Sequence, residues 1–130
     1  MAIGFTFLIV DDDQDGRFLL ERALVGQFEG AEILSCASAQ AARAALDQTR
    51  IDAIVTDNKL GGESGVEFIR GLRQRGITCP VVVVTGSTDP KVERAAYEAG
   101  ANKVFSADRG DFATYLRAAL SSAPNERESR

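Results

Sequence analysis

The sequence contains no histidine. This absence excludes general acid–base catalysis by an imidazole, and any metal site built on histidine ligands, within this chain. Cysteine is scarce, with Cys36 and Cys79 as the two examples. Because the sequence is not that of a small, cysteine-dense secreted domain, we expect buried or half-buried thiols rather than a disulfide.

Long apolar runs and clusters of positive charge are absent as well. No apolar stretch approaches the roughly 20 residues that span a bilayer, and no charged region followed by a long apolar stretch marks a signal peptide. Lysine and arginine form no run, and the formal net charge is −4. We therefore expect cytoplasmic residence, no direct binding of nucleic acid and no association with a membrane.

What is present is a regular alternation of short apolar segments with amphipathic ones. With 130 residues, 45% of them hydrophobic, we expect one domain with a single core. Four of the five apolar segments are nearly continuous, which is typical of parallel strands covered on both faces. The expected strands span residues 5–10, 31–36, 52–56, 81–84 and 103–106, and the expected helices, with their caps, span 14–27, 38–48, 64–76, 90–100 and 111–121.

This alternation predicts an α/β fold with helices on both sides of a parallel sheet. The domain is expected to occupy residues 1–121, and residues 122–130 form a polar, charged tail. Helical periodicity also predicts the buried faces. The first helix is expected to bury Leu19, Leu20, Ala23 and Leu24, and the third to bury Gly65, Phe68, Ile69 and Leu72.

Polar residues follow three of the expected strands directly. The acidic triplet 11–13, Asp57 and Thr85 each come immediately after an apolar run. Singly, each has a structural explanation: a helix cap, the start of a loop and a turn hydroxyl. Jointly they predict a site, because neighbouring parallel strands bring their carboxyl ends to one edge of the sheet, where ligands bind.

Asp11, Asp12 and Asp57 would repel one another at that edge. A like-charged pair at about 5 Å costs roughly 3 kcal/mol at an effective dielectric constant of about 20. Hard oxygen ligands favour Mg²⁺, which is usually held by one or two carboxylates together with phosphate oxygens. The pattern therefore suits phosphoryl transfer, with one of the carboxylates as the nucleophile.

Four stretches carry a more specific pattern. They are Leu8-Ile9-Val10-Asp11-Asp12-Asp13 with Arg17; Asp57 with Leu60 and Gly65; Val81-Val82-Val83-Val84 followed by Thr85; and Ala99-Gly100-Ala101. In these stretches the chain resembles, over about residues 4–120, the receiver domain of bacterial two-component response regulators. The resemblance implies a flavodoxin-like, doubly wound sheet of five parallel strands in the order 2-1-3-4-5, with five helices. That order would place Cys36 and Cys79 far apart across the sheet.

The same resemblance implies a role for each polar residue. Asp57 matches the phosphoacceptor, which takes a phosphoryl group from a sensor histidine kinase or a phosphotransfer protein. Asp11 and Asp12 match the acidic pair that binds Mg²⁺ together with Asp57 and the backbone carbonyl of Lys59. Thr85 matches the switch hydroxyl that contacts the phosphoryl group.

The sequence departs from the family pattern at the fifth strand and in the loop after the acceptor. At the end of the fifth strand the family usually has Lys-Pro, and this chain has Ala107-Asp108. Within that strand Val104 stands where the family usually has an aromatic residue. In the loop after the acceptor, Gly61 stands where the family usually has a proline. The missing lysine is the largest loss, because a cation there pairs with the acceptor carboxylate and then with the phosphoryl oxygens. Arg109 and Lys103 are the candidates to compensate.

These observations favour a phosphoacceptor signalling domain rather than an enzyme, with no output domain in this chain. It would act by altered partner binding or by relaying phosphate. One alternative is a receiver-like interaction module that works without phosphorylation, as Ala107 and Val104 suggest. Another is a haloacid-dehalogenase-type phosphatase, because Asp11-x-Asp13 after a strand fits that nucleophile pattern, although the chain lacks room for the usual cap and leaves Asp57 unexplained.

Overall fold

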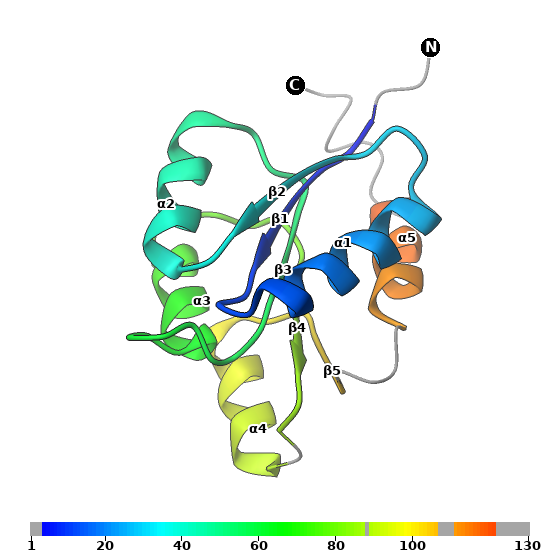
Figure 1. The fold of residues 1–130 in the computed structure, drawn as a ribbon. Helices are drawn as coiled ribbons and strands as arrows, with labels where there is room; N and C mark the ends of the chain where they lie inside the picture. Colours follow the sequence, from blue (N-terminus) through cyan, green and yellow to red (C-terminus); the bar gives the residue numbers. More distant parts are fainter. Residues whose placement is uncertain (1–3, 88, 107–110, 122–130) are drawn as a thin grey trace.

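Five short strands form one parallel sheet in the computed structural model, which describes residues 4–87, 89–106 and 111–121 (Figure 1). The strands lie in the order β2-β1-β3-β4-β5, and this confirms the predicted flavodoxin-like order 2-1-3-4-5. Their bounds are β1 Thr6–Val10, β2 Glu32–Cys36, β3 Ala53–Thr56, β4 Val81–Thr85 and β5 Lys103–Ser106. Thr85 pairs with Ser106, so β4 runs one residue beyond its expected end.

Five helices cover the two faces of this sheet. Helices α1 and α5 lie against one face, and α2, α3 and α4 lie against the other (Figure 1). Their bounds are α1 Gln14–Gln27, α2 Ala39–Gln48, α3 Gly65–Gln74, α4 Pro90–Ala99 and α5 Phe112–Ser121. None of the described helices is both long and apolar enough to cross a membrane.

The three central strands are apolar except for a threonine at one end of each, because both of their faces are buried. Successive side chains of a strand point to opposite faces, so Leu8 and Val10 enter the core under α2 to α4, while Phe7 and Ile9 enter the core under α1 and α5. The same alternation divides β3 and β4 between the two cores. Continuous burial thus explains the nearly continuous apolar runs.

Local capping signals in the sequence set most helix ends. Ser38 caps α2, and Ser64 caps α3 in a reciprocal capping box with Glu67. Pro90 occupies the first turn of α4, and Gly100 ends that helix at a φ of 118°, which a residue without a Cβ adopts at little cost. These expected helix starts and stops are confirmed.

Leu19 corrects one prediction about α1. The side chain was expected in the core, but it is 67% exposed, while Leu20 and Leu24 are buried. Consecutive helical residues lie about 100° apart around the axis, and residues four apart share a face. The face that α1 turns to the sheet is therefore centred on Leu20 and Leu24, and it leaves Leu19 outside.

The two cysteines are free, as expected. Cys36 ends β2, whereas Cys79 precedes β4. Strands β1 and β3 lie between β2 and β4 in the sheet. The predictions for Ala107, Asp108, Arg109 and the tail 122–130 fall outside the described residues.

Candidate functional site

Asp11 and Asp57 are neighbours because their strands are neighbours in register. Val10 pairs with Thr56 at the carboxyl ends of β1 and β3, so the next residue of each strand is an aspartate. The Asp57 N–H donates to the Val10 carbonyl at 2.9 Å, and the Asp11 N–H donates to the Cys36 carbonyl at 3.1 Å. The backbone ladder thus extends to both aspartates and holds them at the sheet edge.

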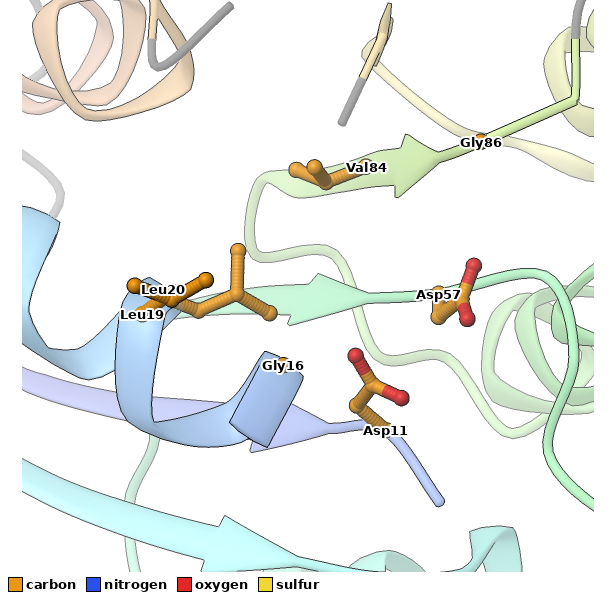
Figure 2. A pocket seen from close by; sticks show the side chains of 7 residues that line it. All are labelled: Asp11, Gly16, Leu19, Leu20, Asp57, Val84 and Gly86. Atoms are coloured by element: carbon orange, nitrogen blue, oxygen red, sulfur yellow. The ribbon is translucent and has the colours of Figure 1, made fainter. Parts of the chain in front are cut away.

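Three carboxylates meet at this edge. Asp11, Asp12 and Asp57 each offer an oxygen, and these oxygens lie within 4.8 Å of one another. Asp11 is buried, Asp57 is half-buried and Asp12 is exposed. Figure 2 shows Asp11 and Asp57 close together, just beyond the ends of their strands. The expected convergence of these three residues is therefore present.

Asp57 is held by the backbone of its own loop. The Asn58 N–H donates to Asp57 Oδ1 at 2.7 Å, and the Lys59 N–H also bonds the carboxylate. The Thr56 hydroxyl donates to the Asp57 carbonyl at 2.8 Å. Burial, assisted by repulsion from Asp12, raises the pKa of Asp57 despite the two amide hydrogen bonds. The carboxylate is oriented by donors that do not fully offset its lost hydration.

Asp11 experiences the same conflict. Burial is the largest effect that raises its pKa, and repulsion from Asp57, Asp12 and Asp13 adds to it, while a hydrogen bond from the Asp13 N–H at 3.0 Å acts in the opposite direction. Arg17 lies nearby, but its Nη1 donates to the Asp11 backbone carbonyl at 2.7 Å. A divalent cation bound by these oxygens would relieve the repulsion, and hard carboxylate donors suit Mg²⁺.

Asp13 has a structural role instead. It is exposed and caps α1, where its side chain accepts from the Gly16 N–H at 2.8 Å. The second carboxylate of the Asp11-x-Asp13 pattern is thereby explained by helix capping.

A small open pocket of about 120 Å³ lies beside the carboxylates (Figure 2). Its acidic wall is Asp11 and Asp57, and its other lining residues are Gly16, Leu19, Leu20, Val84 and Gly86. The apolar side chains come from α1 and β4. The pocket therefore has an acidic side and an apolar side.

Two glycines make room for the aspartates. A Cβ at Gly16 would lie 2.5 Å from Asp11 Oδ2, and a Cβ at Gly65 would lie 2.5 Å from the Asp57 carbonyl oxygen. Gly65 belongs to the sequence pattern, whereas Gly16 was not predicted to matter. Its signal was a glycine in the first turn of a helix, where glycine is unfavourable without a packing reason.

Lys59 lies in the loop between β3 and α3. It pairs with Ser64 in an isolated antiparallel bridge. The two hydrogen bonds of this bridge are made by Asn58, which precedes Lys59, and by Leu60, which follows it. Lys59 also lines a second pocket together with Asp12, and the hydrogen bond from its N–H to the Asp57 carboxylate places its peptide beside the acidic cluster. The role of its carbonyl as a metal ligand stays a prediction.

Thr85 lies at the end of β4 and is buried. Its hydroxyl accepts from the Ser87 N–H at 3.2 Å, and its side chain lines a pocket of about 220 Å³ between α4 and β5 with Val104 and Ser106. Among the described residues, Val84 and Gly86, rather than Thr85, line the pocket beside Asp57. Both sequence neighbours of Thr85 therefore line the acidic pocket, while Thr85 itself lines the pocket between α4 and β5.

Residues 7–108 match the family model described as the response regulator receiver domain. The DNA-binding transcriptional regulator NtrC of Escherichia coli K12 is 33% identical over 100 residues, which cover 72% of this chain and 19% of that protein. The chain therefore spans about a fifth of the length of the curated relatives it matches.

Solved structures with the same fold include receivers of several bacteria. The signal receiver domain of an HD domain-containing protein from Pseudomonas fluorescens Pf-5 has a TM-score of 0.85 at 21% identity, over 98% of this chain and 95% of that one. A putative response regulator from Chloroflexus aurantiacus J-10-fl has a TM-score of 0.81 at 29% identity, over 91% and 98%.

Proposed function

The chain belongs to the response regulator receiver domain family, and from that premise we propose that Asp57 accepts a phosphoryl group from a sensor histidine kinase or a phosphotransfer protein. One observation carries the proposal. Asp11, Asp12 and Asp57 bring carboxylate oxygens within 4.8 Å of one another at the ends of two neighbouring strands. A receiver is a signalling domain, and we propose that this one acts through altered partner binding rather than turnover of a substrate.

The proposed transfer uses Asp57 as the nucleophile. A carboxylate oxygen of Asp57 attacks the phosphorus of a phosphohistidine, the P–N bond breaks, and the electron pair of that bond leaves with the imidazole nitrogen. The amides of Asn58 and Lys59 hold the carboxylate in place for this attack. Orientation of this kind lowers the entropic part of the barrier.

We propose that Asp11, Asp12, Asp57 and the Lys59 carbonyl hold Mg²⁺. The ion, when bound, neutralises negative charge on the carboxylates and the incoming phosphoryl group. The raised pKa of Asp11 and that of Asp57 support this assignment, because burial is the largest cause in both and repulsion from Asp12 adds to it, so a bound cation would stabilise both ionised carboxylates. Exposed Asp12 would complete the ligand set from the solvent side.

Thr85 is proposed to couple the phosphoryl group to a partner surface. Its hydroxyl is held by Ser87 in the pocket between α4 and β5, one residue from Gly86 at the rim of the acidic pocket. A hydroxyl that turns from this pocket toward a phosphoryl oxygen would change the packing of both elements. The two arrangements would then present different surfaces to a partner.

A second candidate function is a receiver-like interaction module that works without phosphorylation. The pocket of about 220 Å³ beside Val104 favours it, because a small side chain stands where the family usually has an aromatic one. The phosphatase alternative is set aside, since the chain belongs to the receiver family and Asp13 caps a helix.

Incubation with acetyl phosphate and Mg²⁺, followed by intact-mass measurement, tests the leading proposal. We expect one phosphoryl adduct on the unmodified chain and none on Asp57→Asn, which keeps the shape of the side chain and removes its charge. An adduct that persists in the variant would place the acceptor elsewhere, with Asp11 or Asp12 next in line. No adduct on either protein would favour the phosphorylation-independent module.

A further inference from the structure

An ion pair outside the acidic cluster fastens the loop that carries Lys59. Arg43 Nη1 donates to Glu63 Oε2 and Arg43 Nη2 donates to Glu63 Oε1, both at 3.0 Å. Arg43 belongs to α2, and Glu63 belongs to the loop between β3 and α3. Two parallel hydrogen bonds between a guanidinium and a carboxylate fix orientation as well as distance.

The loop has two short arms that hydrogen-bond to each other. The Gly65 N–H donates to the Asn58 carbonyl at 2.7 Å, and the Leu60 N–H donates to the Glu63 carbonyl at 3.1 Å. Lys59 lies in the middle of the first arm, opposite Ser64 in the second. The carbonyl of Glu63 therefore restrains the residue that directly follows Lys59, while its carboxylate is held by Arg43.

The tip of the loop needs such an anchor. It consists of Gly61 and Gly62, both exposed, and a Cβ at either position would meet no atom within 4 Å. Glycine loses more conformational freedom on ordering than any other residue. A loop with this tip samples other positions of the Lys59 peptide unless its second arm is fixed, and binding a cation through that peptide would then cost more entropy.

We propose that Arg43 is a positioning residue for the divalent-cation site, acting through Glu63 to hold the Lys59 carbonyl beside Asp11, Asp12 and Asp57. This inference rests on the function proposed above. It assigns to α2, which contributes no residue to the acidic cluster, a part in setting the affinity for Mg²⁺.

The sign of the effect separates positioning from simple electrostatics. Arg43 is a positive charge near a site for a positive ion, so loss of that charge alone would strengthen Mg²⁺ binding. Loss of an anchor would weaken it. Arg43→Gln therefore gives opposite results for the two causes.

Another ion pair among the described residues offers a matched control. Arg75 Nη2 donates to Asp47 Oδ1 at 2.6 Å, and this pair also links α2 with the end of α3. Arg75→Gln likewise removes one positive charge and an ion pair made with α2, although that pair has one hydrogen bond where Arg43–Glu63 has two. It lies at the opposite end of α3 from the metal loop, so the Lys59 peptide should not move.

The test is a Mg²⁺ titration of the free proteins, without a phosphodonor, followed by the amide NMR signals of Asn58 to Leu60. We expect Arg43→Gln to raise the dissociation constant roughly two- to fivefold, the range set by a half-exposed ion pair. Arg75→Gln should match the unmodified chain. Arg43→Lys should fall between, because an ammonium keeps the charge but loses the fork.

Each other result overturns the inference. Equal or tighter binding by Arg43→Gln would do so, and so would equal weakening by Arg75→Gln. If Arg43→Gln does not fold, Arg43→Lys decides, and an affinity equal to that of the unmodified chain rejects positioning. An unmodified chain that binds no Mg²⁺ would reject the proposed metal site along with the inference, whereas normal binding with no effect of Arg43 would reject the inference alone.

Discussion

Asp11 and Asp57 hold their carboxylates where burial opposes ionisation. In the folded chain the pKa of each is raised above the ordinary value of 3.8, and unfolding would restore that value. Groups with a raised folded pKa stabilise the fold fully below their unfolded pKa, and this contribution is lost as the pH rises through the folded pKa. At neutral pH and without a cation, both residues therefore weaken the fold.

Asp57→Asn should consequently stabilise the protein in Mg²⁺-free buffer at pH 7. Asparagine keeps an oxygen that can accept from the Asn58 N–H and removes the half-buried charge. We expect a gain of about 1 kcal/mol in the free energy of unfolding, which is a usual size when a substitution removes an unfavourable charge. Urea denaturation across a pH series measures it. The gain should shrink as the pH falls toward 3.8, and a gain that grows in acid would contradict the charge explanation.

The three consecutive aspartates show what residue type alone could not predict. Strand ends predicted that carboxylates would gather, because Val10 and Thr56 end neighbouring strands in register. The separation of Asp11 and Asp12 from Asp13 depended on family resemblance, since all three share the same side chain. Only the folded backbone shows that Asp13 turns to the Gly16 amide, which is a matter of local dihedral angles.

At the scale of the element, helix positions were predictable because they depend on local signals. The bounds of α1 match the expected ones, and Ser38 and Ser64 cap α2 and α3 as their sequence neighbourhood indicates. The Arg43–Glu63 pair was not predictable. It joins residues 20 positions apart, and long flexible side chains carry no periodic signal of their partners.

Two glycines of α1 allow a sharp test of how that helix serves the site. Gly16→Ala would place a Cβ 2.5 Å from Asp11 Oδ2, whereas Gly26→Ala would meet nothing within 4 Å. Gly26→Ala should stabilise the fold by about 0.5–1 kcal/mol through helix propensity. Gly16→Ala should lose that gain and also weaken Mg²⁺ binding, because the Asp11 carboxylate must move.

Urea denaturation and a Mg²⁺ titration of both variants provide the measurement. Gly26→Ala serves as the control, since it makes the same substitution in the same helix away from the pocket. Unchanged Mg²⁺ affinity in Gly16→Ala would mean that the carboxylate adapts to the methyl group, and Gly16 would then have no part in the site.

At the scale of the whole molecule, one end of the sheet carries the acidic cluster and the other carries hydrogen bonds that stabilise the fold. The carboxyl ends of β1 and β3 carry the acidic cluster. At the opposite end, Arg73 of α3 donates to the carbonyls of Gly100, Ile77 and Cys79, and to Asn102 Oδ1. One guanidinium thus ties the ends of α3 and α4 to the starts of β4 and β5.

Removal of this guanidinium should lower the stability of the fold without changing Mg²⁺ binding at the acidic cluster. Arg73→Ala leaves the half-buried carbonyls of Ile77 and Cys79 without their charged donor, and hydrogen bonds to charged groups contribute about 1.5–3 kcal/mol each before solvent replaces part of them. We expect a loss of about 2–3 kcal/mol in the free energy of unfolding, measured in urea. Arg70→Ala is the control, because it removes an exposed arginine from the same helix.

Mg²⁺ affinity decides whether the two ends are independent. Arg73 and the acidic cluster lie at opposite ends of parallel strands, and effects of well-separated groups without shared partners usually add. Arg73→Ala should therefore keep the dissociation constant of the unmodified chain at temperatures where it stays folded. A higher dissociation constant for Mg²⁺ would show that the contacts at the ends of α3 and α4 affect the acidic cluster. The loop between β3 and α3 leads directly into α3, so we would then expect its amide NMR signals to change first.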